Sequence, residues 1–230
     1  MAKTILMVLT SHGRIDADHP TGFWFEEMAE PYMAFVEAGF AVDIASIAGG
    51  EPPADPRSLE APLPDSVARF RADPAAMAKL AATPALEAVD TARYDAIFLA
   101  GGHGTMWDFP ESEALARAVA EGLAAGRVVA AVCHGPAGLV AARGADGRPA
   151  IAGRRVAGFT NGEEAAVGLT GAVPFLLEDR LKDCGGLYEK GPDFQPFAIA
   201  DGTLVTGQNP ASSLAVARLV RDILEPAPKP

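Results

Sequence analysis

Short apolar runs alternate with stretches of helical periodicity along most of the chain. The apolar runs span residues 4–9, 42–47, 96–100 and 128–132. Such runs are typical of strands that are buried on both faces. Helical patterns span residues 25–36, 111–125 and 212–224, and glycines follow the first two. The alternation predicts an α/β fold, a three-layer sandwich in which a mainly parallel sheet carries helices on both faces.

Three segments depart from this alternation. Residues 51–64 contain five prolines and predict a long surface excursion, part of an insertion near residues 49–80. Residues 143–160 are rich in glycine and arginine and predict a short hairpin. Residues 225–230 are rich in proline and predict a short frayed tail. With no internal repeat, the simplest organisation is one domain over residues 1–230.

Composition and charge narrow the classes of partner. The chain has 230 residues, 49% hydrophobic and 21% charged, which argues against general disorder. Its net charge of −11 has the wrong sign for a phosphate backbone or an anionic membrane surface, so we expect neither nucleic acid nor membrane as a partner. The chain shows no secretory signal or membrane-spanning stretch and has only two cysteines, which predicts a reduced, cytoplasmic protein.

The most informative position is Cys133. An apolar strand runs directly into this cysteine, and Gly135-Pro136 suits the start of a helix. The cysteine is therefore predicted on a sharp turn at the carboxyl end of a central strand, where open α/β sheets bind ligands. Free amide hydrogens at such a nucleophile elbow favour a thiolate, and the turn should be strained. The alternative, a small buried apolar cysteine, is what composition alone favours.

Partners for Cys133 are less clearly marked. The predicted strand 96–100 ends in Gly101-Gly102-His103, a turn that predicts amide donors for an oxyanion or a lining for the substrate. Glu27 lies near the start of a helix, four residues before Pro31, and Glu164 follows a Thr-Asn-Gly turn. From spacing alone, both glutamates could equally lie on solvated helix faces.

Five stretches, taken together and in order, resemble the ThiJ/PfpI superfamily, and within it the branch of glutathione-independent glyoxalases (glyoxalase III) and heat-shock chaperone-like proteins. They are residues 21–27 (TGFWFEE), 101–107 (GGHGTMW), 131–136 (AVCHGP), 158–164 (GFTNGEE) and 206–212 (TGQNPAS). The resemblance implies a flavodoxin-like, class I glutamine-amidotransferase-like fold and a homodimer. It also implies that Cys133 is the nucleophile, that His134 and Glu164 complete a triad, and that Glu27 acts on the sulfur as a general acid/base.

The activity implied by the resemblance is conversion of methylglyoxal and water to lactate, with the Gly102 and His134 amides holding the oxyanion. No histidine follows His134, so the triad of the glutamine amidotransferases cannot form. We expect no cofactor and no metal, and a small carbonyl compound as substrate. The alternatives are a holdase chaperone or oxidation sensor, favoured by an apolar patch around Trp24, Trp107 and Phe109, and a cysteine-dependent deglycase, amidase or peptidase.

Overall fold

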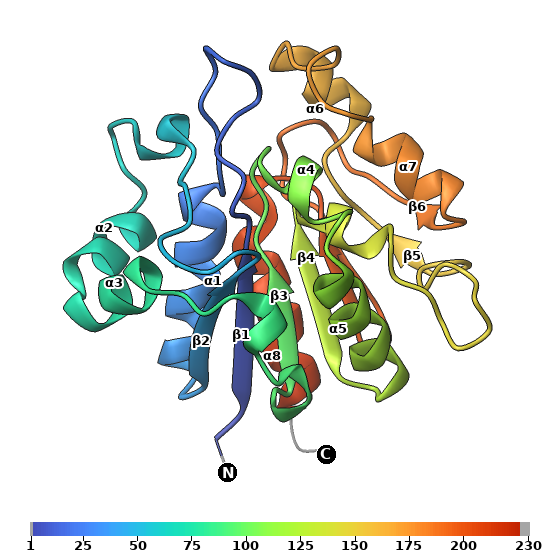
Figure 1. Ribbon diagram of the computed structural model, residues 1–230, viewed down its shortest axis with the longest axis horizontal. Coiled ribbons are helices and arrows are strands. Elements are labelled where there is room, and N and C mark those ends of the chain that lie inside the picture. The colour runs from blue at the N-terminus through green and yellow to red at the C-terminus, as the bar shows by residue number, and fades with distance from the viewer. Residues whose placement is uncertain (1, 226–230) are drawn as a thin grey trace.

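A six-stranded sheet forms the centre of the molecule in the computed structural model, which describes residues 2–225. Its strand order is β2-β1-β3-β4-β8-β7, with the first five strands parallel and β7 antiparallel at one edge. The strands are β1 (Thr4–Leu9), β2 (Ala41–Ser46), β3 (Ala96–Leu99), β4 (Val128–Val132), β7 (Ala198–Asp201) and β8 (Leu204–Gly207). The carboxyl ends of the five parallel strands meet at the upper edge of the sheet in Figure 1.

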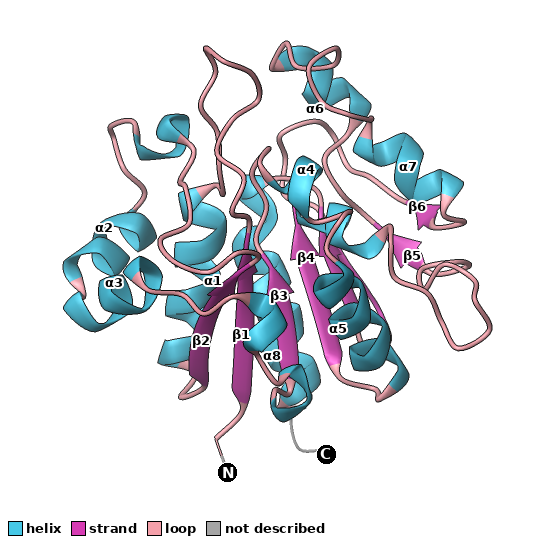
Figure 2. Cartoon of the chain, viewed as in Figure 1, coloured by secondary structure: helices cyan, strands magenta, loops and turns pink. Residues whose placement is uncertain are grey.

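Helices cover both faces of this sheet. Helices α1 (Phe25–Glu37) and α8 (Ser213–Leu224) pack side by side on one face, and α5 (Glu113–Ala124) covers β3 and β4 on the other (Figure 1). The remaining helices are α2 (Asp65–Ala72), α3 (Pro74–Ala81), α4 (Thr105–Asp108), α6 (Asn161–Ala166) and α7 (Leu177–Asp183). Figure 2 shows α6 and α7 beyond the carboxyl edge, next to the small parallel pair β5 (Arg155–Val156) and β6 (Leu187–Tyr188).

Burial explains why the apolar runs become the inner strands. All residues of β3 and β4 are buried, and β1 is buried from Ile5 to Leu9. Between two helical layers both faces of a strand are dry, so a strand needs apolar side chains at successive positions rather than at alternate ones. The same sandwich sets β4 in the middle of the sheet, so the residue that follows it lies at the centre of the carboxyl edge.

The predicted α/β sandwich is confirmed, and the predicted strands and helices agree with the observed ones to within one or two residues at each end. The short hairpin predicted over residues 143–160 is confirmed only in its first part, where Arg143 and Pro149 form an antiparallel bridge and the Ala150 amide donates to the Ala142 carbonyl (3.0 Å). The second part does not belong to a hairpin, because Arg155–Val156 pairs in parallel with β6. The proline-rich excursion contains a 3-10 helix, Pro56–Leu59, before α2 and α3.

The predicted frayed tail lies outside the described residues apart from Glu225. Within residues 2–225, no helix is both long enough and apolar enough to cross a membrane.

Candidate active site

Cys133 occupies a strained turn directly after β4. Its φ is 58°, in the left-handed region that residues other than glycine rarely adopt, which confirms the predicted strain. The turn is held on both sides, since the Cys133 amide donates to the Gly207 carbonyl (3.0 Å) and its carbonyl accepts from the Phe159 amide (2.9 Å). A Cβ at Gly135 would lie 2.4 Å from the Leu99 carbonyl oxygen, so only glycine lets the chain pass so close to β3. The segment that follows is a five-residue 3-10 helix, Gly135–Leu139.

His134 connects the cysteine to a buried carboxylate. Its Nδ1 lies 3.3 Å from the Cys133 sulfur, and its Nε2 lies 2.8 Å from Oε2 of Glu164, in the first turn of α6. The second oxygen of Glu164, Oε1, lies 2.9 Å from Nε2 of His103, so one carboxylate bridges two histidines. From the sequence we predicted that His103 contributes its backbone amide to the site. The hydrogen bond between its ring and Glu164 was not predicted.

Glu27 is a second titratable group that interacts with the Cys133 side chain. Helix α1 runs through Pro31 without interruption and carries Glu27, fully buried, in its first turn. Carboxyl oxygen Oε2 accepts a hydrogen bond from the Gly101 amide (2.8 Å), while Oε1 is buried without a partner of normal hydrogen-bond geometry. The Cys133 side chain interacts with this carboxyl. An orphaned carboxyl oxygen beside a thiol is an arrangement suited to proton exchange.

Burial determines the protonation of this pair. It raises the pKa of Glu27 well above the usual value, more than the contact with the Cys133 side chain and the hydrogen bond from the Gly101 amide lower it. Burial, followed by the negative charge of Glu27, also raises the pKa of the Cys133 thiol. The expectation that the elbow by itself ionises the thiol was therefore wrong. The amide of His134 does lower the pKa of the thiol, but one amide at a short 3-10 helix does not offset burial beside a carboxyl.

The pKa values of His134 and Glu164 are lowered, whereas those of Glu27 and Cys133 are raised. Burial lowers the pKa of His134 to about 4, with a further contribution from His103, so the ring is neutral near pH 7. The pKa of Glu164 falls to about 2, because hydrogen bonds from His103 and His134 outweigh the effect of burial. A neutral base beside the thiol and an ionised carboxylate behind that base form a cysteine–histidine–glutamate arrangement.

The glycine turn after β3, Gly101-Gly102, packs against the Glu27 carboxyl and the His134 amide. Gly102 has a φ of 104°, and a Cβ there would lie 2.4 Å from the Trp24 amide nitrogen. A Cβ at Gly101 would lie 2.5 Å from Glu27 Oε2 and 2.8 Å from the His134 amide nitrogen. Within residues 2–225, the amides of Gly102, His103 and His134 donate to no backbone carbonyl. Gly102 and His134 also line the cavity at Cys133, where free amides can hold an oxyanion.

A small cavity of about 180 Å³ opens onto the cysteine. Its walls are mostly apolar. It is lined by Trp24, Arg57, Gly102, His103, Cys133, His134, Phe159, Val167, Phe194 and Pro210. Sequence reasoning missed Arg57 and Phe194. Arg57 comes from the proline-rich excursion, and Phe194, 45% exposed and at a φ of 59°, comes from an irregular loop that carries no recognisable signal.

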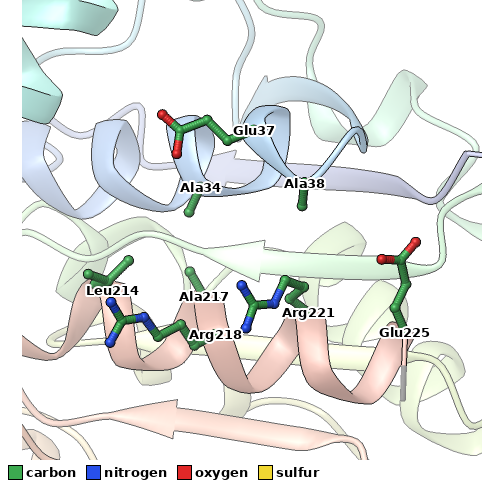
Figure 3. Close-up of a pocket in the computed structure, with 8 residues that line it drawn as sticks. All are labelled: Ala34, Glu37, Ala38, Leu214, Ala217, Arg218, Arg221 and Glu225. Atoms are coloured by element: carbon green, nitrogen blue, oxygen red, sulfur yellow. The ribbon is translucent and has the colours of Figure 1, made fainter. Parts of the chain in front are cut away.

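Other hollows lack this chemistry. A groove of about 370 Å³ between α1 and α8 contains neither cysteine nor histidine (Figure 3). Figure 3 shows the side chains that line it: Ala34, Glu37, Ala38, Leu214, Ala217, Arg218, Arg221 and Glu225. The remaining cysteine, Cys184, caps the end of α7 and does not line the cavity.

None of the three residues expected to form the apolar patch of a chaperone is fully exposed, and Trp24 is half-buried in the wall of the cavity. Phe109 is fully buried, and Trp107 is half-buried and stacks on His12 at a centroid distance of 5.0 Å. His12 therefore packs on Trp107 and does not line the cavity at Cys133.

Among the described residues, His103, His134 and Glu164 offer ligand atoms within 4.8 Å of one another, so these three could hold a metal ion. Both histidine Nε2 atoms, however, already make hydrogen bonds to the two oxygens of Glu164. The donor set is therefore engaged in a hydrogen-bond network that a cation would have to displace.

Several known proteins are similar to this one over nearly the whole chain. The chain is 34% identical to the glutathione-independent glyoxalase HSP31 of Saccharomyces cerevisiae, over 94% of this chain and 95% of that protein. The structure of glyoxalase III from Candida albicans matches with a TM-score of 0.89 and 27% identity, over 96% of this chain and 97% of that one. The Rapid Encystment Protein 24 KDa of Francisella tularensis matches with a TM-score of 0.93 and 38% identity, over 96% and 99%.

The model of the DJ-1/PfpI family matches residues 20–222. That stretch includes the strained cysteine, its neighbouring histidine and both buried glutamates, so the match covers the site and every strand of the sheet except β1. The resemblance seen in the sequence is thereby confirmed, and the chain belongs to the DJ-1/PfpI family.

Proposed function

We propose that this protein is a glutathione-independent glyoxalase that converts methylglyoxal and other 2-oxoaldehydes, with water, to lactate and the corresponding 2-hydroxy acids. The observation that carries the proposal is the strained Cys133 at the cavity, with a neutral histidine on one side and the buried Glu27 carboxyl on the other. The names of the yeast and Candida relatives support the same activity. A cavity of about 180 Å³ suits a small carbonyl compound.

In the first step the Cys133 sulfur attacks the aldehyde carbon. The thiol proton passes to Nδ1 of His134, which lies 3.3 Å from the sulfur, and the electron pair of the carbonyl bond moves to its oxygen. The Gly102 and His134 amides stabilise the oxyanion. Return of the proton from His134 to this oxygen gives a neutral hemithioacetal.

In the second step Glu27 moves a proton between the two carbons. The step starts from the ionised form of Glu27, whose carboxylate takes the proton from the former aldehyde carbon, while a carbon–carbon double bond forms and the ketone oxygen becomes negative. His134 relays the hemithioacetal hydroxyl proton to that oxygen. Glu27 then returns its proton to the second carbon, which leaves a thioester and a secondary alcohol. A raised pKa makes Glu27 a stronger base than an ordinary carboxylate.

In the third step water hydrolyses the thioester. His134 takes a proton from water, the resulting hydroxide adds to the thioester carbonyl, and the carbon–sulfur bond breaks. The sulfur leaves with the bonding pair and recovers a proton, which releases the 2-hydroxy acid. Glu164 holds the His134 ring through its hydrogen bond of 2.8 Å during this step.

The test is lactate formation from methylglyoxal without glutathione. Wild-type protein and the matched control Cys184→Ala, which removes the cysteine remote from the cavity, should both turn over. Cys133→Ala should be inactive, and Glu27→Gln should lose turnover by a factor of about 10² or more. Lack of lactate from the wild type, or full activity of Glu27→Gln, would refute the proposal.

The assembly and the compartment belong to the same proposal. We infer a homodimer from the family resemblance, and sedimentation equilibrium of the purified protein would measure it. Both cysteines are free, which supports a reducing compartment such as the cytoplasm, and cell fractionation would test that location. Limited proteolysis that leaves residues 2–225 in one piece would support a single domain.

A further inference from the structure

A chain of hydrogen bonds extends beyond the triad to the proline-rich excursion. His103 Nδ1, the ring nitrogen that does not face Glu164, lies 3.4 Å from Nη2 of Arg57. Arg57 also lines the cavity. Neither Arg57 nor the His103 ring has a step in the proposed reaction, yet both are connected through Glu164 to the histidine that does.

Arg57 is itself fixed in place by a buried carboxylate. Its Nε and Nη2 bind the two oxygens of Asp55 at 3.0 and 2.7 Å, and the Asp55 side chain is fully buried. The Thr21 hydroxyl donates to the same carboxylate at 2.9 Å. Although burial raises the pKa of Asp55, the hydrogen bonds and charge of Arg57 bring it below the usual value, so Asp55 is ionised. A planar guanidinium held at two atoms has a defined direction for its remaining donors.

The direction of each proton along this chain follows from what each group can do. A guanidinium only donates, so the Nδ1 of His103 facing it must carry a lone pair. A neutral His103 then has its proton on Nε2 and donates to Glu164. Since Glu164 is ionised and can only accept, Nε2 of His134 must also donate to it. His134 is neutral, so its Nδ1, the nitrogen beside the Cys133 sulfur, is left unprotonated.

We propose that Arg57 and His103 are positioning residues, which fix the tautomers of both histidines through Glu164 and so leave His134 Nδ1 free to take the Cys133 proton. His103 fills the second oxygen of Glu164, which keeps the carboxylate from turning away from His134. Arg57 prevents His103 from moving its proton to Nδ1, where it would no longer donate to Glu164. The inference concerns the site of the proposed glyoxalase but is tested without its substrate.

The first readout is the tautomeric state of each ring, measured by nitrogen NMR of protein labelled at the histidine ring nitrogens. At pH 7 the wild type should show both His103 and His134 protonated on Nε2 and unprotonated on Nδ1. Arg57→Lys keeps a positive charge for Asp55 but lacks the fork that also reaches His103, so His103 should acquire a population protonated on Nδ1. Arg155→Lys makes the same exchange at a surface pair with Glu189 and should leave both rings unchanged.

The second readout is the rate at which iodoacetamide alkylates Cys133 at pH 7, in a Cys184→Ala background so that one cysteine reports. Arg57→Lys and His103→Ala should lower this rate about tenfold, because the base beside the thiol is no longer held in the accepting tautomer. His103→Gln, whose amide can donate to Glu164, should restore most of the rate. Thermal unfolding of each variant shows whether it folds.

Ring tautomers that are unchanged in Arg57→Lys, or an alkylation rate equal to that of Arg155→Lys, would overturn the inference. The same holds for a wild-type His134 that is protonated on Nδ1. If the rings and the thiol behave as expected but the wild type makes no lactate, the proposed activity is wrong and the positioning role stands.

Discussion

Glu27→Gln should make the protein more stable at neutral pH while it lowers turnover by a factor of about 10² or more. Glu27 is fully buried, and one of its oxygens lacks a hydrogen-bond partner of normal geometry. The amide of a glutamine would be no better satisfied at that position, but it can keep the bond from the Gly101 amide through its oxygen and stays neutral at every pH. Keeping the carboxyl in the core costs about 1.4 kcal/mol for each unit by which burial raises its pKa, as long as the pH lies above the ordinary value. We therefore expect the variant to gain about 1–3 kcal/mol at pH 7.

The sign of the pH dependence follows from the raised pKa. In the unfolded chain Glu27 ionises near its ordinary pKa of 4.5, whereas in the folded protein it keeps its proton to higher pH. Folding then takes up a proton above about pH 4.5, so the wild type loses stability relative to the variant by up to about 1.4 kcal/mol per pH unit. The difference should be small below pH 4.5, grow above it, and level off once the folded carboxyl ionises.

Urea unfolding of both proteins between pH 4.5 and pH 8 measures this difference. A gain of 1 kcal/mol corresponds to about 2–4 °C in Tm for a chain of this size, so calorimetry gives an independent check. Glu121→Gln, an exposed carboxyl on α5, is the matched control and should show no such trend. A variant less stable than the wild type at pH 7 would refute the reasoning. A difference that does not vary with pH would show that Cys133 and Glu27 share a single proton.

Three further predictions concern the glycine turn, the cavity wall and metal ions. Gly101→Ala should lower kcat for methylglyoxal about 100-fold, because its Cβ would push Glu27 and the His134 amide apart. The control Gly171→Ala, whose new Cβ meets no atom within 4 Å, should keep the wild-type kcat, and equal activities of the two variants would contradict the geometry. Phe194→Ala should lower kcat/KM for phenylglyoxal about tenfold more than for methylglyoxal, because it removes an apolar wall of the cavity; equal losses would mean that the ring does not contact the substrate. Dialysis against EDTA should leave lactate formation unchanged, because hydrogen bonds occupy the only close donor set among the described residues; a loss restored by Zn²⁺ would count against this.

The sequence predicted the inner strands well for a physical reason. β1 and β4 lie between two layers of helices, so each is a continuous apolar run, and both predictions matched residue for residue. The hairpin of β7 and β8 was not predicted. β8 has only four residues and ends in a glycine, and β7 at the sheet edge is partly exposed, so neither gives a long apolar run.

The site was predictable to the extent that its residues are neighbours in sequence or lie in familiar motifs. Cys133 and His134 are adjacent and follow a strand, and strand order alone brings the glycine turn after β3 next to them. The contacts of Glu164 with His103 and His134 depend on where α6 lies relative to the sheet. The local sequence pattern does not determine that position. The charge state of the thiol was mispredicted because burial beside Glu27 outweighs the effect of one backbone amide.

Glu163 and Glu164, adjacent in one helical turn, serve different parts of the molecule. Glu163 is buried and accepts hydrogen bonds from the Phe194 amide (2.8 Å), from the side chains of Gln208 (3.0 Å) and Asn209 (2.8 Å), and from the Thr160 amide (2.9 Å). The loop that carries Phe194 is thus tied to the same turn that presents Glu164 to the histidines. An engineer who trims that loop to admit bulkier substrates will also loosen the anchorage of the triad, so widening the entrance and preserving the rate are competing design goals.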